Sequence, residues 1–277
     1  MDIKELKRLA VKGDVNAQYE LGEYFNGEDN YDEAVHWYLL AAKQGHIKAQ
    51  YALGDCYALG FGVEEDWEQA YHWFYSAAKQ GYAEAQFDVA ECLATGTGVE
   101  ENKTDAVGWY LKSAQGGCVF AQVAVGILYE DGEIVPQNFS EAAKWYQLAA
   151  EQGDLEGQYN LGCLYLNGHG VEQNYEKAFE LFTLAASDYK YGSIYALNNI
   201  GYCYENGYGV TQNAEKAFEY YLLAAQGGDE VAAFNVGECY ELGKGVSKNL
   251  PKSLEWYRIA AERGDKDAQK KIHELMK

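Results

Sequence analysis

Residues 45–81 have the sequence GHIKAQYALGDCYALGFGVEEDWEQAYHWFYSAAKQG, and both halves of it show the spacing of an amphipathic helix. Small and apolar residues recur every three or four positions: Ala49, Leu53, Gly54 and Tyr57, then Ala70, Trp73, Phe74, Ala77 and Ala78. The sequence Gly60-Phe61-Gly62-Val63 between the halves is typical of a turn. The stretch therefore predicts two helices joined by a turn, with Gly81 just after the end of the second helix.

The same pattern repeats along the whole chain. A glycine marks each copy, at Gly13, Gly45, Gly81, Gly117, Gly153, Gly192, Gly228 and Gly264. Most intervals are 36 residues long, and each carries a small residue, a turn, an aromatic pair and Ala-Ala in the same order. Because one helix pair cannot bury both of its faces, stacked neighbours must complete the core. We therefore predict an all-α fold, a right-handed α-solenoid superhelix of stacked antiparallel helix pairs.

The pattern predicts seven repeats within residues 13–264, starting near positions 13, 45, 81, 117, 153, 192 and 228. Residues 1–12 look like a second helix without its partner and residues 265–277 like a first helix, so both are expected to be capping helices. The whole chain would then form one continuous solenoid domain. Repeat 1 lacks four residues in its turn, and repeat 5 has three extra residues around positions 187–191. That insertion either bends the superhelix locally or is a tolerated loop.

The recurring Ala-Gln, Leu-Gly-x-x-Tyr, Gly-x-Gly-Val, Trp-Tyr and Ala-Ala-x-x-Gly marks make the chain resemble the Sel1-like repeat family, relatives of the tetratricopeptide repeat. The resemblance covers essentially the whole chain. Members are mostly adaptors and scaffolds. It therefore implies a non-enzymatic protein that holds a partner protein or peptide on its concave face, which the first helix of each repeat would line. Some bacterial members are immunity proteins, so an inhibitor that neutralises a toxin or another enzyme is the alternative.

The chain is strongly acidic. Its 277 residues include 22 Lys and Arg against 43 Asp and Glu, which gives a formal net charge of −21. Binding to nucleic acids or to anionic membranes depends on basic residues, so we expect neither kind of partner. No apolar stretch is long enough to cross a membrane, and Met1–Arg8 lack the apolar core of a signal peptide. We therefore expect a cytoplasmic protein without membrane insertion; the sequence leaves its oligomeric state open, with a monomer favoured.

The six cysteines predict no disulfide. Four of them, Cys56, Cys92, Cys203 and Cys239, occupy the same position in four repeats. Equivalent positions of stacked helices lie about 9–10 Å apart, whereas a disulfide needs Cα atoms within about 7 Å. Cys118 and Cys163 lie elsewhere in their repeats. Free thiols are typical of the cytoplasm.

No motif points to catalysis, to a cofactor or to a metal. The Gly-x-Gly turns lack the third glycine, the preceding strand and the Lys-Ser/Thr of phosphate-binding loops. The sequence has no Gly-x-Ser-x-Gly elbow and no His-Glu-x-x-His motif. His36 and His72 occupy equivalent sites on successive second helices, but a zinc site needs three or four ligands. We therefore expect no enzyme; a hydrolase is the less favoured alternative, because it would need a cleft of convergent titratable groups.

The charge is concentrated in residues 13–138, which carry 21 acidic and 5 basic residues. On the first helix of each repeat, positions outside the packing face form a stripe that varies between repeats, as a recognition surface would. The expected partner-binding residues on this stripe are Glu20, Glu23, Asp55, Asp88, Glu91, Ile127, Glu130, Asp131, Asn160, Asn167, Asn199, Tyr202, Glu205, Asn235, Glu238 and Glu241. Its acidic part would attract a basic partner, unless the charge serves only solubility. Its asparagines would hydrogen-bond an extended peptide, unless they are ordinary surface residues.

Overall fold

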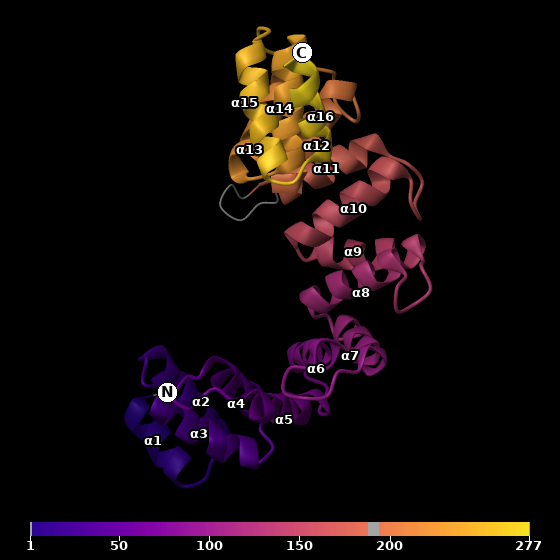
Figure 1. Ribbon diagram of the computed structural model, residues 1–277. Helices are drawn as coiled ribbons and strands as arrows, with labels where there is room; N and C mark the ends of the chain where they lie inside the picture. The colour runs from indigo at the N-terminus through magenta and orange to yellow at the C-terminus, as the bar shows by residue number, and fades with distance from the viewer. Residues whose placement is uncertain (1, 188–193, 277) are drawn as a thin grey trace. The chain divides into compact units, whose positions relative to one another are not determined.

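The computed structural model describes residues 2–187 and 194–276 (Figure 1). Within these residues the chain forms sixteen α-helices and no β-strand, which confirms the predicted all-α class. The helices are α1 (Ile3–Val11), α2 (Val15–Gly27), α3 (Tyr31–Lys43), α4 (Ile47–Leu59), α5 (Trp67–Ala78), α6 (Ala83–Thr95), α7 (Lys103–Gln115), α8 (Val119–Asp131), α9 (Phe139–Glu151), α10 (Leu155–Asn167), α11 (Tyr175–Ala185), α12 (Ile194–Asn206), α13 (Ala214–Gly227), α14 (Glu230–Leu242), α15 (Leu250–Glu262) and α16 (Lys266–Leu275).

Each repeat consists of an even-numbered first helix and the odd-numbered second helix that follows it. The two helices pack against each other, as in the pairs α2–α3, α4–α5, α6–α7, α10–α11, α12–α13 and α14–α15. Second helices also pack on the first helix of the next repeat, as α3 does on α4 and α13 on α14. The terminal helices α1 and α16 pack on α2 and α15.

The helices begin and end near the capping residues that are typical of helix ends in the sequence. Asp154 accepts a hydrogen bond from the backbone N–H of Gly157 at 2.6 Å, which satisfies a free donor at the start of α10. After α3, Gly45 has a φ of +89°, and its N–H donates to the carbonyl of Ala42. This is the C′ geometry predicted for the glycine that marks each repeat.

Small residues at the helix contacts leave room for buried aromatic rings. The largest fully buried side chains include Tyr38, Tyr146, Phe182, Tyr221 and Tyr257, all from second helices. Tyr221 packs so closely on Gly201 of α12 that a Cβ at this glycine would lie 2.7 Å from the ring. Burying each ring stabilises the fold by about 2–3 kcal/mol.

The second glycine of the turn brings neighbouring repeats into contact. Gly209 has a φ of +67°, in the left-handed region that favours glycine. A Cβ on Gly209 would lie 2.5 Å from the carbonyl carbon of Tyr175 and 2.8 Å from the Cα of Glu176, at the start of α11. The turn of repeat 6 therefore lies directly against the backbone of repeat 5. Gly170 and Gly245 make the equivalent contact in repeats 5 and 7.

A buried glutamine ties each of the first three repeats to the helix before it. The Nε2 atoms of Gln18, Gln50 and Gln86 each donate to the backbone carbonyl eight residues earlier, at 3.1 Å. Gln80 in turn donates to the side-chain oxygen of Gln50 at 2.8 Å. The recurring Ala-Gln mark of the sequence is thus a structural link between repeats.

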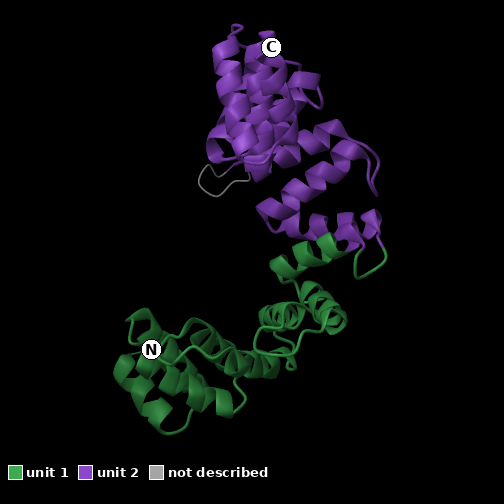
Figure 2. Ribbon diagram, in the orientation of Figure 1, with its two compact units in different colours: residues 1–128, 133–136 green, residues 129–132, 137–277 purple. Residues whose placement is uncertain are grey.

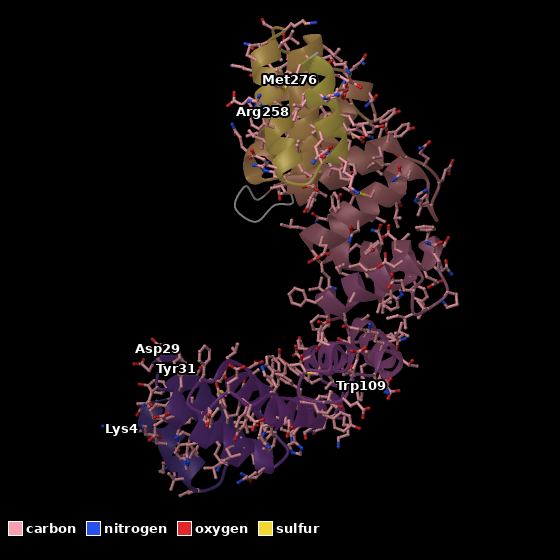
Figure 3. All side chains as sticks on the ribbon, in the orientation of Figure 1. Lys4, Asp29, Tyr31, Trp109, Arg258 and Met276 are labelled. Carbon is pink, nitrogen blue, oxygen red and sulfur yellow. The ribbon has the colours of Figure 1, made fainter. Side chains whose placement is uncertain are left out.

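The shortened turn of repeat 1 has its own geometry. Asp29 takes a φ of +57°, a left-handed conformation that glycine supplies in the longer turns. The hydroxyl of Tyr31 donates to its carboxylate at 2.9 Å, and the two side chains lie together at this turn (Figure 3).

The chain divides into two compact units (Figure 2). Unit 1 comprises Met1–Leu128 and Glu133–Pro136, and unit 2 comprises Tyr129–Gly132 and Gln137–Lys277. Each unit is described by itself, and the single continuous domain stays a prediction. The insertion around positions 187–191 is expected to be either a local bend or a tolerated loop, and most of it lies outside the described part of the chain, which omits residues 188–193. Among the described helices, none is long and apolar enough to span a membrane.

Candidate functional site

Five of the ten acidic residues of the predicted stripe lie on three first helices of unit 1. We use the name acidic stripe for Glu20 and Glu23 on α2, Asp55 on α4, and Asp88 and Glu91 on α6. Glu20, Glu23 and Glu91 are exposed, whereas Asp55 and Asp88 are half-buried. Ile127, the apolar member of the stripe in unit 1, lies exposed on α8.

Five carboxylates of the predicted stripe are hydrogen-bonded inside their own repeat. In each case a tyrosine hydroxyl from the second helix donates to a glutamate on the first helix. The pairs are Tyr38–Glu23, Tyr110–Glu91, Tyr146–Glu130, Tyr221–Glu205 and Tyr257–Glu241. The last three measure 2.7, 2.8 and 2.6 Å. These glutamates therefore help to hold the two helices of a repeat together, a role that the sequence analysis missed.

Two of the paired glutamates also bind lysines in unit 2. Lys244 contacts Glu205 at 2.7 Å, and Lys271 contacts Glu241 at 3.1 Å. Burial acts to raise the pKa of Glu205, but hydrogen bonds from Lys244 and Tyr221 hold that pKa below its usual value. The two side chains are thus stable anions that already have cationic partners.

Repeats 2 and 5 lack the tyrosine hydroxyl, because Phe74 and Phe182 occupy the position. Repeat 5 also lacks the carboxylate, since Cys163 and Leu166 stand where other repeats have the glutamate. Repeat 2 is different: it keeps a carboxylate, Asp55, without the hydroxyl. No described residue donates a hydrogen bond to Asp55. The pKa of its carboxyl group is set by burial and by the charge of Asp88.

Burial and nearby carboxylates raise the pKa of both Asp55 and Asp88. Burial, and then the neighbouring charge of Asp88, raise the pKa of Asp55 to about 7. Burial also raises the pKa of Asp88 to about 6, although a hydrogen bond from Tyr51 lowers it in part. The charges of Glu91 and Glu84 also act to raise the pKa of Asp88, because like charges disfavour ionisation. A cation bound at Asp55 would offset part of this penalty.

Two hollows in unit 1 meet at Asp55. The first, of about 400 Å³, is lined by Tyr19, Glu23, Asn26, Tyr38, Lys48, Tyr51, Ala52, Asp55, Cys56, Leu59, Phe61 and Tyr82. The second, of about 370 Å³, is lined by Asp55, Ala58, Leu59, Trp67, Phe74, Asp88, Glu91, Cys92, Thr95 and Thr97. The structure thus brings four of the five acidic-stripe residues to these hollows, and leaves Glu20 outside them.

The stripe residues of unit 2 are largely occupied by internal contacts. Asn199 donates to the sulfur of Cys163 at 3.7 Å, and Asn235 donates to the side-chain oxygen of Asn198 at 3.0 Å. Asn167 donates to the backbone carbonyl of Cys163 at 2.9 Å. These asparagines have fewer free amide donors for a peptide than the sequence suggests.

The other unit 2 stripe residues lie on four different helices. Asn160 and Glu238 are half-buried, on α10 and α14, and Asp131 is exposed at the end of α8. Tyr202 is exposed and its ring lies 5.7 Å from that of Tyr208. Unit 1 is therefore the better candidate for a binding site.

Possible metal ligands and six cysteine thiols occur in residues 2–187 and 194–276. No group of three His, Cys, Asp or Glu side chains is placed to hold a metal ion there. The six cysteines are free, and five are buried. Burial raises the pKa of Cys163 to about 11, so this thiol stays protonated at neutral pH.

Asp55→Asn is expected to stabilise the protein above neutral pH. Because its pKa is raised in the folded state, ionised Asp55 destabilises the fold; this cost is complete above about pH 7 and disappears as the pH falls toward 4. The substitution should raise the free energy of unfolding by up to about 4 kcal/mol at pH 8 and change it little near pH 4. Urea denaturation at the two pH values measures the difference, with the exposed Glu100→Gln as control. An equal gain at both pH values would contradict this explanation.

Comparisons with known proteins agree with the repeat geometry. The model of a family described as Sel1 repeat matches residues 15–46, 47–82, 83–118, 119–154, 155–188, 194–229 and 231–265. The crystal structure of a Sel1 repeat protein from Oxalobacter formigenes is similar, with 30% identity, a TM-score of 0.75, and coverage of 88% of this chain and 96% of that one.

A second similar crystal structure is that of c5321, a protective antigen present in uropathogenic Escherichia coli strains that displays an SLR fold. The two sequences are 33% identical, and the TM-score is 0.84. The match covers 99% of this chain but only 59% of the length of c5321. Among curated proteins, none matches the sequence.

Proposed function

This chain belongs to the Sel1 repeat family, and from that premise we propose that it is a non-enzymatic scaffold that binds a basic protein or peptide partner. The binding surface is the stripe-bearing face of the first helices in unit 1. Stacked helical repeats commonly serve as protein-binding surfaces. The cytoplasm is the proposed location, and the six free cysteines support it.

The acidic stripe and its two hollows carry this proposal. The lining of the hollows includes Glu23, Asp55, Asp88 and Glu91 against a single cation, Lys48. Such an excess of one charge raises the local concentration of oppositely charged ligands and speeds their encounter. Ionised Asp55 destabilises the folded protein. Residues that serve a function often lower stability in this way, so the cost supports a binding role for Asp55.

Co-purification from the source organism tests the proposal. A variant with Glu20→Lys, Asp55→Asn and Asp88→Asn changes the charge of the stripe and spares the tyrosine-bonded glutamates. A variant with Glu100→Lys and Glu133→Lys makes the same charge change at exposed turn residues. We expect wild type and the turn variant to recover the same stoichiometric partner, and the stripe variant to recover at least tenfold less. Equal recovery by all three proteins would reject the acidic stripe as the binding site.

A further inference from the structure

The two hollows place an unpartnered carboxylate beside aromatic rings. Asp55 and Leu59, one turn apart on α4, line both hollows. Tyr19, Tyr51 and Tyr82 also line the first hollow. The rings of Tyr51 and Tyr82 lie 5.0 Å apart, edge to face, and fix each other's orientation. The first hollow is thus an aromatic pocket with a carboxylate in its wall.

Exposed apolar side chains line the same hollows. Leu59 is 60% exposed, Phe61 42% and Trp67 37%, and all three line one or both of the hollows. The indole N–H of Trp67 donates to Glu65 at 3.0 Å, which holds this ring in place. Large apolar side chains exposed together around a pocket are typical of an interaction surface.

We propose that the pocket at Asp55 receives the guanidinium group of an arginine side chain from the partner. The proposal rests on the proposed function and names the chemistry that the site recognises. The guanidinium would bind the Asp55 carboxylate, stack on the tyrosine rings, and bring apolar neighbours in the partner against Leu59 and Phe61.

Arginine fits this site better than lysine does. Its planar group matches a carboxylate through two parallel hydrogen bonds and stacks on aromatic faces, whereas an ammonium group is a compact, strongly hydrated charge. Cation–π contacts with tyrosine are strongest where water is excluded, as in a pocket. Asp88 and Glu91 in the second hollow add negative charge, while Lys48 in the first opposes it.

Titration calorimetry with purified full-length protein tests the assignment. The probe is an acetylated, amidated peptide Gly-Leu-Arg-Leu-Gly, and its matched analogue carries citrulline, which has nearly the same shape without the charge. We expect the arginine peptide to bind at least tenfold more tightly than the citrulline peptide, and several-fold more tightly than a lysine peptide. Asp55→Asn should lower the affinity at least tenfold, whereas Glu100→Gln should change it less than twofold.

Equal binding of the arginine and citrulline peptides, or full binding by Asp55→Asn, would overturn the assignment. Because Asp55→Asn is expected to be at least as stable as wild type, a loss of binding cannot be ascribed to unfolding; thermal denaturation of the variant checks this. The result is independent of any native partner. If the peptides fail while the co-purification succeeds, the arginine pocket is wrong and the scaffold stands. If the arginine peptide binds but all three proteins recover the partner equally, Asp55 binds arginine but the acidic stripe is not the site that holds the partner.

Discussion

Replacing Gly209 by alanine should destabilise unit 2 by about 3 kcal/mol or more. Two costs add at this position. A Cβ in the left-handed region costs about 1–2 kcal/mol, and this one would also overlap the backbone of Tyr175 and Glu176 at the start of α11. Overpacking of this kind typically costs about 1–3 kcal/mol. Urea denaturation followed by circular dichroism should show a clearly lower midpoint.

Gly153→Ala is the matched control for this prediction. Gly153 has a φ of +86°, but a Cβ there would meet no atom within 4 Å. Its substitution should therefore cost only the backbone strain of about 1–2 kcal/mol. If the two variants lost the same stability, the contact between neighbouring repeats would contribute nothing, and glycine would be needed at 209 for its conformation alone.

The repeat period and the turn glycines could be predicted from the sequence, because each mark recurs at the same position. The contact between Gly209 and repeat 5 could not be predicted, since both glycines of a Gly-x-Gly turn look alike in sequence. Only the packing distinguishes them: in repeat 7, a Cβ at Gly243 would make ordinary contacts, while one at Gly245 would overlap the backbone of Ala214.

The tyrosine–glutamate pairs could not be predicted from the sequence, for a different reason. The tyrosine recurs at one position, but its acceptor does not. Glu23 and Glu91 follow the small residue of the first helix directly, whereas Glu130 and its equivalents lie three residues further on. The two positions are nearly one helical turn apart on the same face, so both reach the hydroxyl. Because the glutamate alternates between two positions, these positions vary between repeats. The prediction of a recognition stripe rested on that variation.

The pocket at Asp55 could be predicted only in part. The charge of the acidic stripe is visible in the sequence, but the aromatic wall comes from Tyr19, Tyr51 and Tyr82, which belong to three different repeats. Tyr19 and Tyr51 recur beside the Ala-Gln mark and were left out of the stripe. Their convergence depends on the stacking of α2 and α4, which no local pattern specifies.

Tyr146→Phe and Glu130→Leu should each destabilise unit 2, whereas the double variant should be nearly as stable as wild type. Tyr146 is fully buried and donates to Glu130 at 2.7 Å. Tyr146→Phe leaves a half-buried carboxylate without its donor, at a cost of about 2 kcal/mol, because hydrogen bonds to charged groups contribute about 1.5–3 kcal/mol. Glu130→Leu leaves the hydroxyl without its acceptor, at a cost of about 1–2 kcal/mol.

The double variant copies a combination that the chain already uses. In repeat 5, Phe182 and Leu166 occupy the positions of Tyr146 and Glu130, and Phe182 is fully buried. Replacing both partners by apolar groups removes the unsatisfied atoms, so the double variant should lie within about 1 kcal/mol of wild type. A double-mutant cycle in urea would then give a coupling energy of about 2 kcal/mol. Additive losses of stability would instead show that Glu130 and Tyr146 act independently. The glutamates of the stripe would then have no structural role, and partner binding would be their expected role.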